Sequence, residues 1–430
     1  MRKRFFLLGM LSVVLFMGSV FTVFGQEKTI TLNFWSQWND PGVRQFTTDW
    51  MALWQKEFPD IKIEHRILPN DSADELMRTA FVSGSPPDIC YQEAVYDLFQ
   101  WANDGKVRNL KTDIWDKYPD RFNPATIPWI SDRPDARWGV PIQMISEGHI
   151  FYNKDLCKKY GVDVTTFKTY NDFLKACQKF KDASVTPIAL GNKPGWPGSQ
   201  WFQYFLGETL QKDELWACLN RTKKNQSPKW TDPGFVKAAQ YLKDLVDRGF
   251  FDPGVAMMEY DAGKMMFFSG RSPFFLTGSW YETLSPPPEL NWGLFRCPHI
   301  TGEPGEKWLA RTVTFLGSLI ASTKCPYPDA QMKFIEFISR PKISKLFWKD
   351  SKGVPAIQGA VNESEMDFAQ KEYSWLYKNA NVAIPYLEYF VNPEAGYGAI
   401  YNGAVGITSG QLTPEEWMKQ VEEAAIKTYE

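Results

Sequence analysis

The sequence predicts a helix-rich α/β protein, because short apolar strands and amphipathic helices alternate along most of its length. Residues 29–91 follow the order strand, helix, strand, helix, strand, and the same rhythm resumes after Trp138. This order is typical of βαβ units with right-handed crossovers, which build mostly parallel sheets flanked by helices. A chain of 430 residues is long enough for two domains or for one large two-lobed domain.

The first part of the chain shows the clearest periodicity. Apolar residues alternate in its strands and recur every three to four residues in its helices. Pro59 ends the first helix, and a capping-box pattern at Ser72 and Glu75 opens the second. The predicted elements here are strands at 29–35, 61–67 and 89–91 and helices at 42–58 and 73–83.

The second part repeats the pattern over a longer stretch. Thr169 with Asp172 predicts a helix start, as do Pro233 after Thr231-Asp232 and Thr413 before Pro414. The predicted strands are 148–152, 186–190, 272–276, 291–296 and 312–321, and a further helix covers 154–160. Periodicity alone does not indicate which of these strands share a sheet.

Residues 1–25 have the composition of an export signal. Arg2, Lys3 and Arg4 precede an apolar run over 5–24, and small residues near Gly25 suit a signal peptidase. We therefore expect cleavage before Gln26 and an extracytoplasmic, periplasmic location. The apolar run is also long enough to span a bilayer as an uncleaved anchor. No Cys follows it until Cys90, so we expect no lipid-anchor Cys at a new N-terminus.

The charge balance argues against nucleic acid as a partner. Without residues 1–25 the chain has 45 basic and 50 acidic residues, a net charge of −5, which attracts neither nucleic acid nor anionic lipid. With three His and no CxxC pair we expect no metal site and no cofactor. The six Cys could be free thiols or disulfides, and Cys157–Cys177 is the first pair to test.

Motifs of the common enzyme classes are absent from the sequence. It has no GxSxG, GxxxxGK[ST] or HExxH segment and no GxGxxG after a strand, so we predict no catalytic residue. Carboxylates are too numerous for their spacing to single out an acid pair of the kind a glycosidase uses. An exported carbohydrate-active enzyme therefore stays open as an alternative.

Aromatic residues are the unusual feature, at 18 Trp, 18 Tyr and 31 Phe. Five Trp lie in polar segments rich in Gly and Pro, where a core role is less natural: Trp35, Trp38, Trp196, Trp201 and Trp280. The loops after the strands at 29–35 and 272–276 should lie at the carboxyl edge of a sheet, where ligands bind. Flat rings beside Gln, Asn and carboxylates suit the C–H faces and hydroxyls of a sugar.

Several short segments, in order, also carry a family resemblance. These are residues 30–35, 57–61, 83–89, 139–156, 274–280 and 409–416, of which 139–156 (Gly139-Val140-Pro141 to Tyr152-Asn153-Lys154-Asp155-Leu156) is the most specific. Together they resemble the extracellular solute-binding proteins typified by maltose-binding protein. The resemblance covers nearly the whole chain after residue 25.

The resemblance implies a two-lobed periplasmic-binding-protein fold with hinge crossovers. By analogy the chain crosses between lobes near Gln143-Met144, Arg311-Thr312 and Ala356-Ile357. The implied first lobe is 26–143 with 312–357, and the implied second lobe is 144–311 with 358–430. A few residues at such crossings can absorb a rotation while the lobes stay rigid.

The family's ligand positions fall on residues from both implied lobes. They match Trp35, Gln37, Trp38, Tyr91, Glu93, Glu147, Trp196, Gln200, Trp201, Trp280 and Tyr397, with Ser146 as the alternative to Glu147. The first loop carries Gln37 and Trp38 where the maltose-type pattern has several charges, so maltose is not the implied ligand.

The sequence thus predicts a monomeric receptor that captures a mono- or oligosaccharide between two lobes and delivers it to the permease subunits of an ABC importer. The alternatives are the exported enzyme named above and the same fold with a different solute. A polyamine would call for a carboxylate-dominated cleft, and a phosphorylated polyol for several basic residues. The candidate loops show neither strongly.

Overall fold

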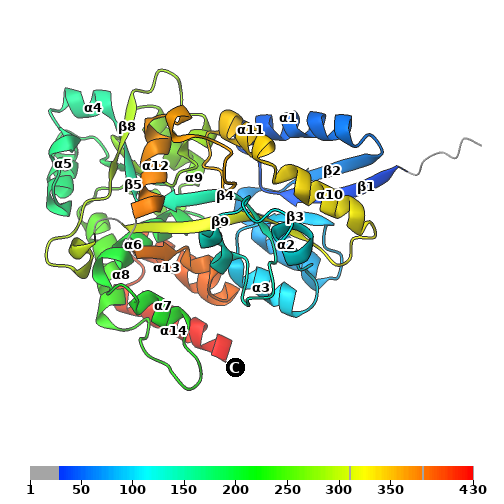
Figure 1. The fold of residues 1–430 in the computed structure, drawn as a ribbon. Helices are drawn as coiled ribbons and strands as arrows, with labels where there is room; N and C mark the ends of the chain where they lie inside the picture. The colour runs from blue at the N-terminus through cyan, green and yellow to red at the C-terminus, as the bar shows by residue number, and fades with distance from the viewer. Residues whose placement is uncertain (1–28, 309–310, 380–381, 430) are drawn as a thin grey trace, which may run out of the picture.

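The computed structural model describes residues 29–308, 311–379 and 382–429. They form two lobes that share a pair of long strands, β4 (Val140–Glu147) and β9 (Arg311–Ala321), which run from one lobe into the other (Figure 1). We call the half with the larger sheet the first lobe and the other half the second lobe. The predicted export signal at 1–25 lies outside the described residues.

The sheet of the first lobe contains six strands among the described residues. They are β1 (Ile30–Ser36), β2 (Ile61–Ile67), β3 (Ile89–Gln92), β10 (Val382–Pro385), β4 and β9, in the order β10-β9-β3-β1-β2 with β4 also paired to β9. β1 is parallel to β2 and β3, as predicted, whereas β9 is antiparallel to β3 and β4. Its helices are α1 (Pro41–Glu57), α2 (Ala73–Val82), α3 (Val95–Asn103), α10 (Pro328–Ile338) and α11 (Pro341–Ser351).

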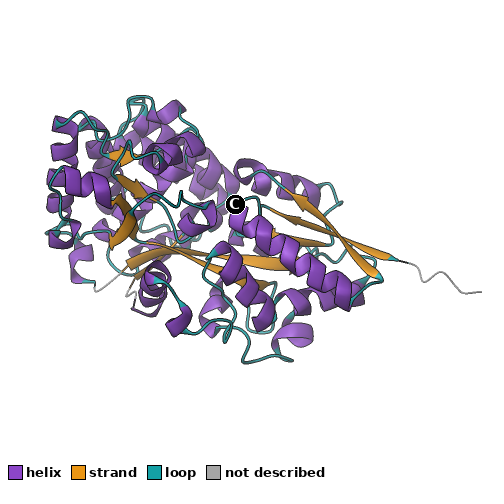
Figure 2. Cartoon of the chain, turned by 90° about the horizontal axis from the view of Figure 1, so that it is seen from above, coloured by secondary structure: helices purple, strands orange, loops and turns teal. Residues whose placement is uncertain are grey.

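The second lobe is richer in helix, as the view from above shows (Figure 2). Its sheet has the order β6-β7-β5-β8, with bounds Ile188–Ala189, Phe274–Leu276, His149–Asn153 and Trp292–Arg296. Its helices are α4 (Lys154–Lys159), α5 (Tyr170–Asp182), α6 (Trp196–Thr209), α7 (Glu214–Leu219), α8 (Pro233–Asp247), α9 (Tyr260–Phe268), α12 (Phe368–Asn379), α13 (Asn402–Thr408) and α14 (Pro414–Ala425).

The expectation of mostly parallel strands is wrong for the second lobe. Only β6 and β7 are parallel, whereas β5 is antiparallel to both β7 and β8. Two helices, α4 and α5, separate β5 from β6. Since each helix reverses the chain, β6 begins at the opposite edge from β5, and the simple βαβ crossover does not form.

Each lobe has its own apolar core. In the first lobe α1 buries Val43, Phe46, Trp50 and Trp54, which recur every three to four residues along one face. The second core is built around α6, whose Trp201, Phe202 and Phe205 are fully buried. Two independent cores allow each lobe to behave as a rigid body.

Three chain segments run side by side where the lobes join. β4 pairs with β9 along its length, and on its other side Gln143 bridges to Pro355 while Ala356 donates its N–H to the carbonyl of Ile142. Sequence periodicity missed β4, because its apolar and polar residues are nearly all buried and do not alternate. The exact lobe boundaries stay a prediction.

Local signals were confirmed to different degrees. The capping boxes at Thr169 and Thr413 are formed, whereas the Ser72 side chain makes no capping hydrogen bond. All six Cys are free and buried, so Cys157 and Cys177, the pair that the sequence analysis singled out, form no disulfide. Among the helices of the described residues, none combines the length and the hydropathy needed to cross a bilayer.

Candidate functional site

A cavity of about 770 Å³ lies between the two lobes. On the first-lobe side it is lined by the loop after β1 and the residues after β3, which form the carboxyl edge of the parallel strands. Gln143 and Ile145 of β4 also line it, and the second lobe contributes the starts of α6 and α9 and the loop after β7. This is the edge at which α/β sheets bind ligands. We call the cavity between the lobes the cleft.

The first-lobe wall is held by packed aromatic rings. Trp38 is only 3% exposed, and its ring lies 5.4 Å from that of Tyr91 and 5.5 Å from that of Phe46. The Tyr91 ring crosses β9 at Gly317, where a Cβ would lie 1.6 Å from the phenol oxygen. Only glycine at that position leaves room for this ring. Trp38 therefore lines the cleft with very little of its side chain exposed.

Glu93 is the polar centre of this wall. Its carboxyl accepts hydrogen bonds from Gln37 Nε2 at 2.8 Å, Tyr91 OH at 2.9 Å and Tyr389 OH at 3.0 Å. Burial, with the neighbouring Asp74 carboxylate, raises the pKa of Glu93 to about 8, although the three hydrogen bonds favour its charged form. At neutral pH a Glu93 that keeps its proton can both donate to and accept from a ligand hydroxyl.

The second-lobe wall presents partly buried rings. Trp196 opens α6, and its ring centroid lies 4.4 Å from that of Tyr260 and 6.2 Å from that of Trp280. Trp280 Nε1 donates to Tyr260 OH at 3.4 Å. The Trp280 ring folds back over Gly278, where a Cβ would lie 2.0 Å from it. These rings form an aromatic wall (Trp196, Tyr260 and Trp280) whose orientation is fixed by contacts among its members.

The C-terminal segment adds a row of tyrosines that sequence reasoning mostly missed. Tyr386, Tyr389 and Tyr401 line the cleft together with Tyr397, the only one of the four that was predicted. Their signal was present in the sequence, since four Tyr occur within residues 386–401, a segment that also contains Gly and Pro. This segment lies far in sequence from the other segments that line the cleft, so the sequence did not indicate that they come together.

Acidic side chains outnumber basic ones around the cleft, unlike the expectation from the isolated loops. The lining carboxylates are Asp40, Asp74, Glu75, Glu93, Glu259 and Asp261, and the lining cations are Arg78 and Lys264. No single loop contributes more than two of these acids, so the imbalance appears only after folding. Several are paired locally: Lys264 bonds Asp261 at 2.6 Å, and Lys193 bonds Glu259.

Two predicted stacking residues do not reach the cleft. Trp35 is absent from its lining because strand alternation puts it on the opposite face of β1 from Phe34, beneath the guanidinium of Arg66 at 4.4 Å. Trp201 lies five residues after Trp196, about 140° further round α6, and is 0% exposed in the second-lobe core. Both are packing residues in this structure.

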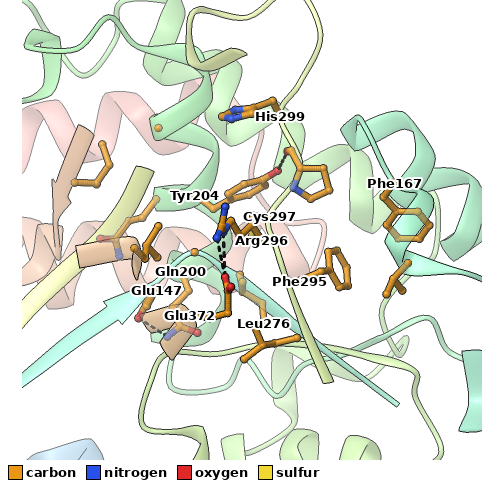
Figure 3. A pocket seen from close by; sticks show the side chains of 18 of the residues that line it. Glu147, Phe167, Gln200, Tyr204, Leu276, Phe295, Arg296, Cys297, His299 and Glu372 are labelled. Atoms are coloured by element: carbon orange, nitrogen blue, oxygen red, sulfur yellow. Dashed lines mark hydrogen bonds and ion pairs between the residues drawn. The ribbon is translucent and has the colours of Figure 1, made fainter. Parts of the chain in front are cut away.

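Glu147 and Gln200 lie at a different cavity. The continuation of β4 beyond Ile145 carries Glu147 past the cleft and under α6, where Gln200 Nε2 donates to its carboxyl at 2.7 Å. Both line a second cavity of about 710 Å³, formed mainly by the second lobe, together with Tyr204, Phe295 and the Arg296–Glu372 ion pair (Figure 3). Burial raises the pKa of Glu147 well above its usual range. Ser146, the alternative to Glu147, is buried and lines neither cavity.

The three histidines lie apart from one another, each in its own surroundings. His65 shares a hydrogen bond with Ser36 Oγ at 2.7 Å, and burial lowers its pKa to about 4. His149 is buried in the second lobe, and His299 lies beside Glu208 at 3.1 Å. In the part of the chain that the structure describes, no group of three or more His, Cys, Asp and Glu side chains is placed to hold a metal ion.

Two lobes joined by crossing strands, with a polar and aromatic cavity between them, define a protein that binds a solute by enclosing it. A family model described as bacterial extracellular solute-binding protein matches residues 39–345. The chain belongs to the bacterial extracellular solute-binding protein family.

Curated relatives share about a fifth of their residues with the chain. An uncharacterized ABC transporter extracellular-binding protein of Pyrococcus horikoshii is 22% identical over 328 residues, which cover 75% of this chain and 70% of the relative. A probable sugar-binding periplasmic protein of Rhizobium meliloti is 22% identical over 354 residues, covering 79% and 80%. Both alignments extend over most of each protein.

Solved structures confirm the fold. One comes from a study of xylan utilization by Caldanaerobius polysaccharolyticus, with a TM-score of 0.82, 23% identity and coverage of 92% of this chain and 99% of that one. A chitin oligosaccharide binding protein also has a TM-score of 0.82, with 21% identity and coverage of 94% and 99%. The two-lobed α/β architecture predicted from the sequence is therefore confirmed.

Proposed function

We propose that this protein is the carbohydrate receptor of an ABC importer and that it encloses a neutral mono- or oligosaccharide in the cleft. The observation that carries the proposal is the aromatic wall Trp196, Tyr260 and Trp280, which faces hydrogen-bonding groups of the first lobe across a shared cavity. A pyranose has both kinds of surface, an apolar C–H face and a ring of hydroxyls.

The polar side of the cleft suits hydroxyls better than charges. Gln37 and Glu93 stand together on the first lobe, and Asn39 and Asn70 also line the cavity. Amide and carboxyl groups each accept a hydroxyl proton, and the amides also donate. Arg78 is bonded to Asp97 at 2.9 Å, so it is already neutralised, which argues against a phosphorylated solute.

The excess of cleft carboxylates favours a polyamine as the second candidate. Six acids against two cations would attract a positively charged solute more strongly than the isolated loops suggested. The aromatic wall is shared by both candidates, since ammonium groups also stack on indole faces. We favour the sugar, because Glu93 and Asp74 already accept hydroxyl donors across the cleft and two more acids are paired with lysines.

The names of relatives support the same ligand class. The Rhizobium relative is named a probable sugar-binding periplasmic protein, a Streptococcus mutans relative a multiple sugar-binding protein, and one structural neighbour a chitin oligosaccharide binding protein. At 21–22% identity these names support a carbohydrate and leave the sugar, its length and its linkage open.

The proposed binding residues are those predicted residues that line the cleft: Gln37, Trp38, Tyr91, Glu93, Trp196, Trp280 and Tyr397. To them we add Tyr260, Tyr386, Tyr389 and Tyr401. We further propose that the protein acts as a monomer, is exported by the signal at 1–25, and presents its closed form to membrane permease subunits.

The receptor is tested by intrinsic fluorescence and calorimetry against a panel of xylo-, chito-, malto- and arabino-oligosaccharides, with spermidine and glycerol 3-phosphate as the alternative solutes. Saturable binding of one sugar series, with the sugar recovered intact after overnight incubation, supports the proposal. Binding of spermidine alone would replace the sugar by a polyamine. Release of shorter products would instead establish the exported carbohydrate-active enzyme.

A further inference from the structure

Among the described residues, three contacts between a hydroxyl and a carboxyl cross the cleft. Tyr389 and Tyr397, which pack with the second-lobe core, donate to first-lobe acids: Tyr389 OH to Glu93 Oε2 at 3.0 Å and Tyr397 OH to Asp74 Oδ2 at 2.8 Å. Thr283 Oγ1 lies 3.2 Å from Asp40 Oδ2, and its proton also has the Trp280 carbonyl as a nearer acceptor at 2.6 Å. The three contacts lie at different parts of the cleft: Asp40 precedes α1, Glu93 follows β3 and Asp74 belongs to α2. A rotation that opens the lobes would break these contacts and hydrate the carboxylates.

The positive charges near the cleft compensate these carboxylates only in part. Arg78 lies 4.5 Å above the Tyr397 ring and close to Asp74, but its guanidinium is bonded to Asp97 at 2.9 Å. The charged neighbour of Glu93 is Asp74, which opposes the charge of Glu93. Arg78 therefore compensates the charge of Asp74 only in part, since its guanidinium also pairs with Asp97.

Asp40 has more mixed surroundings. Lys264 and Arg44 favour its charge, as does its position at the N-terminus of α1, whereas Asp261 opposes it. Burial is still the largest influence and raises its pKa, as it does for Asp74. Burial thus raises the pKa of all three acids. The rise is large for Glu93, whose pKa reaches about 8.

We propose that Asp40, Asp74 and Glu93 are the positioning residues of lobe closure and that closing takes up protons, because closure removes water from their carboxyls against the opposite lobe, and this loss of hydration disfavours the charged form more than the donated hydrogen bonds favour it. The proposal rests on the proposed function only in requiring that the lobes open and close. It does not depend on which solute is bound.

The sign of the pH dependence follows from the burial. A fully hydrated glutamate titrates at about 4.3, and burial in this structure raises the pKa of Glu93 to about 8. Opening removes Tyr389 and the burial that it provides, whereas Gln37 and Tyr91 of the first lobe stay in place. Closure through Glu93 is therefore favoured in full below about 4.3 and weakens as the pH rises towards 8. One fully coupled carboxyl lowers the closed-to-open ratio by at most about tenfold per pH unit in that window.

The lobe distance can be measured without any ligand. Val82 at the end of α2 and Met257 in the second lobe are 78% and 76% exposed, so Val82→Cys with Met257→Cys accepts one spin label on each lobe, while the six native Cys are buried. Pulsed electron–electron dipolar spectroscopy of the full chain between pH 5.5 and 9 should show the short-distance population falling as the pH rises. A distribution that is the same at pH 6 and pH 9 would overturn the proposal.

Variants in the labelled background assign the effect to these residues. Asp74→Asn with Glu93→Gln should flatten the pH profile, because neutral isosteres cannot exchange the proton. Tyr389→Phe with Tyr397→Phe should move the population towards the open form. The effect should be strongest above pH 8, because there the substitutions leave charged carboxylates without their hydroxyl donors. If the acid double variant titrates like the parent, other groups control closure and the proposal fails.

Matched controls lie outside the cleft. Asp60→Asn changes an exposed acid and Tyr160→Phe a tyrosine with no side-chain hydrogen bond among the described residues, and both should reproduce the parent profile. Far-UV circular dichroism confirms that each variant is folded, and the parent series decides the proposal if one is not. A missing response to every sugar would refute the proposed ligand class but leave this measurement intact.

Discussion

The ring centroids of Trp196 and Trp280 lie 6.2 Å apart, with their planes inclined at 64°. One ring comes from the first residue of α6 and the other from the loop after β7, segments separated by more than eighty residues. Tyr260 joins them through its ring and its hydroxyl. The wall therefore has a fixed shape before any ligand arrives, which reduces the conformational entropy lost on binding.

Loss of the Trp280 ring should weaken ligand binding. Trp280→Ala removes a stacking face, and truncation of such an anchor typically costs about 2 kcal/mol, or roughly a 30-fold rise in Kd. Calorimetric titration with the sugar identified by the panel measures it. Trp216→Ala, a partly buried Trp that lines neither cavity, is the matched control. An unchanged Kd for Trp280→Ala would show that ligand does not contact this wall.

Trp201 should govern stability instead of affinity. Its indole is fully buried among Phe173, Tyr204 and Phe205, so Trp201→Ala should leave a cavity and cost about 3–5 kcal/mol. Trp196→Ala, at a partly buried position, should cost much less. Denaturant unfolding followed by circular dichroism compares the two variants. Equal losses of unfolding free energy would contradict the placement of Trp201 in the core.

Stability should decline as the pH rises, in part because of Glu388. Burial raises the pKa of Glu388 to about 7 in the folded chain, against about 4.3 when unfolded. Its contribution to stability is therefore complete below about 4.3 and is lost as the pH rises through about 7. Glu388→Gln should lose less stability than the parent between pH 5 and pH 8. Thermal unfolding of both proteins at the two pH values measures this. An equal loss of stability in the parent and the variant between pH 5 and pH 8 would refute the prediction.

The cysteines should be unreactive in the native protein. Burial raises the thiol pKa of Cys90, Cys157, Cys177 and Cys218, and all six side chains are buried, with Cys297 at 7% exposure the least so. A thiol reagent should label none of them in native buffer and all six after unfolding without reductant. Fewer than six labelled thiols in the unfolded protein would reveal a disulfide.

Much of the first lobe could be predicted from the sequence because its signals are local. Alternation in β1 and β2 and helical spacing in α1 follow directly from which side chains must be buried. The loop after β1 lines the cleft at the carboxyl edge of the sheet, as expected, since parallel strands end there together. Gln37 and Glu93 accordingly meet at 2.8 Å, as neighbouring loops of one sheet should.

The failures have two physical causes. A polar sequence context does not indicate whether a Trp ring lines a cavity or packs in a core, so Trp201 could not be told from Trp196. Alternation along β1 does separate Trp35 from Phe34, but it does not indicate which face of the sheet meets a ligand. The tyrosines of 386–401 meet residues such as Asp74, more than three hundred positions earlier in the chain, which no periodicity can reveal.

By itself the sequence determined the α/β class, the order of the elements and the abundance of aromatic side chains available to a ligand. Burial of apolar surface acts locally along each element, so these properties are written in its spacing. Tertiary structure alone decided which rings line the cleft, that six carboxylates gather around it, and that hydroxyls of one lobe meet acids of the other. Those relationships join segments whose positions depend on how the two lobes pack around β4 and β9.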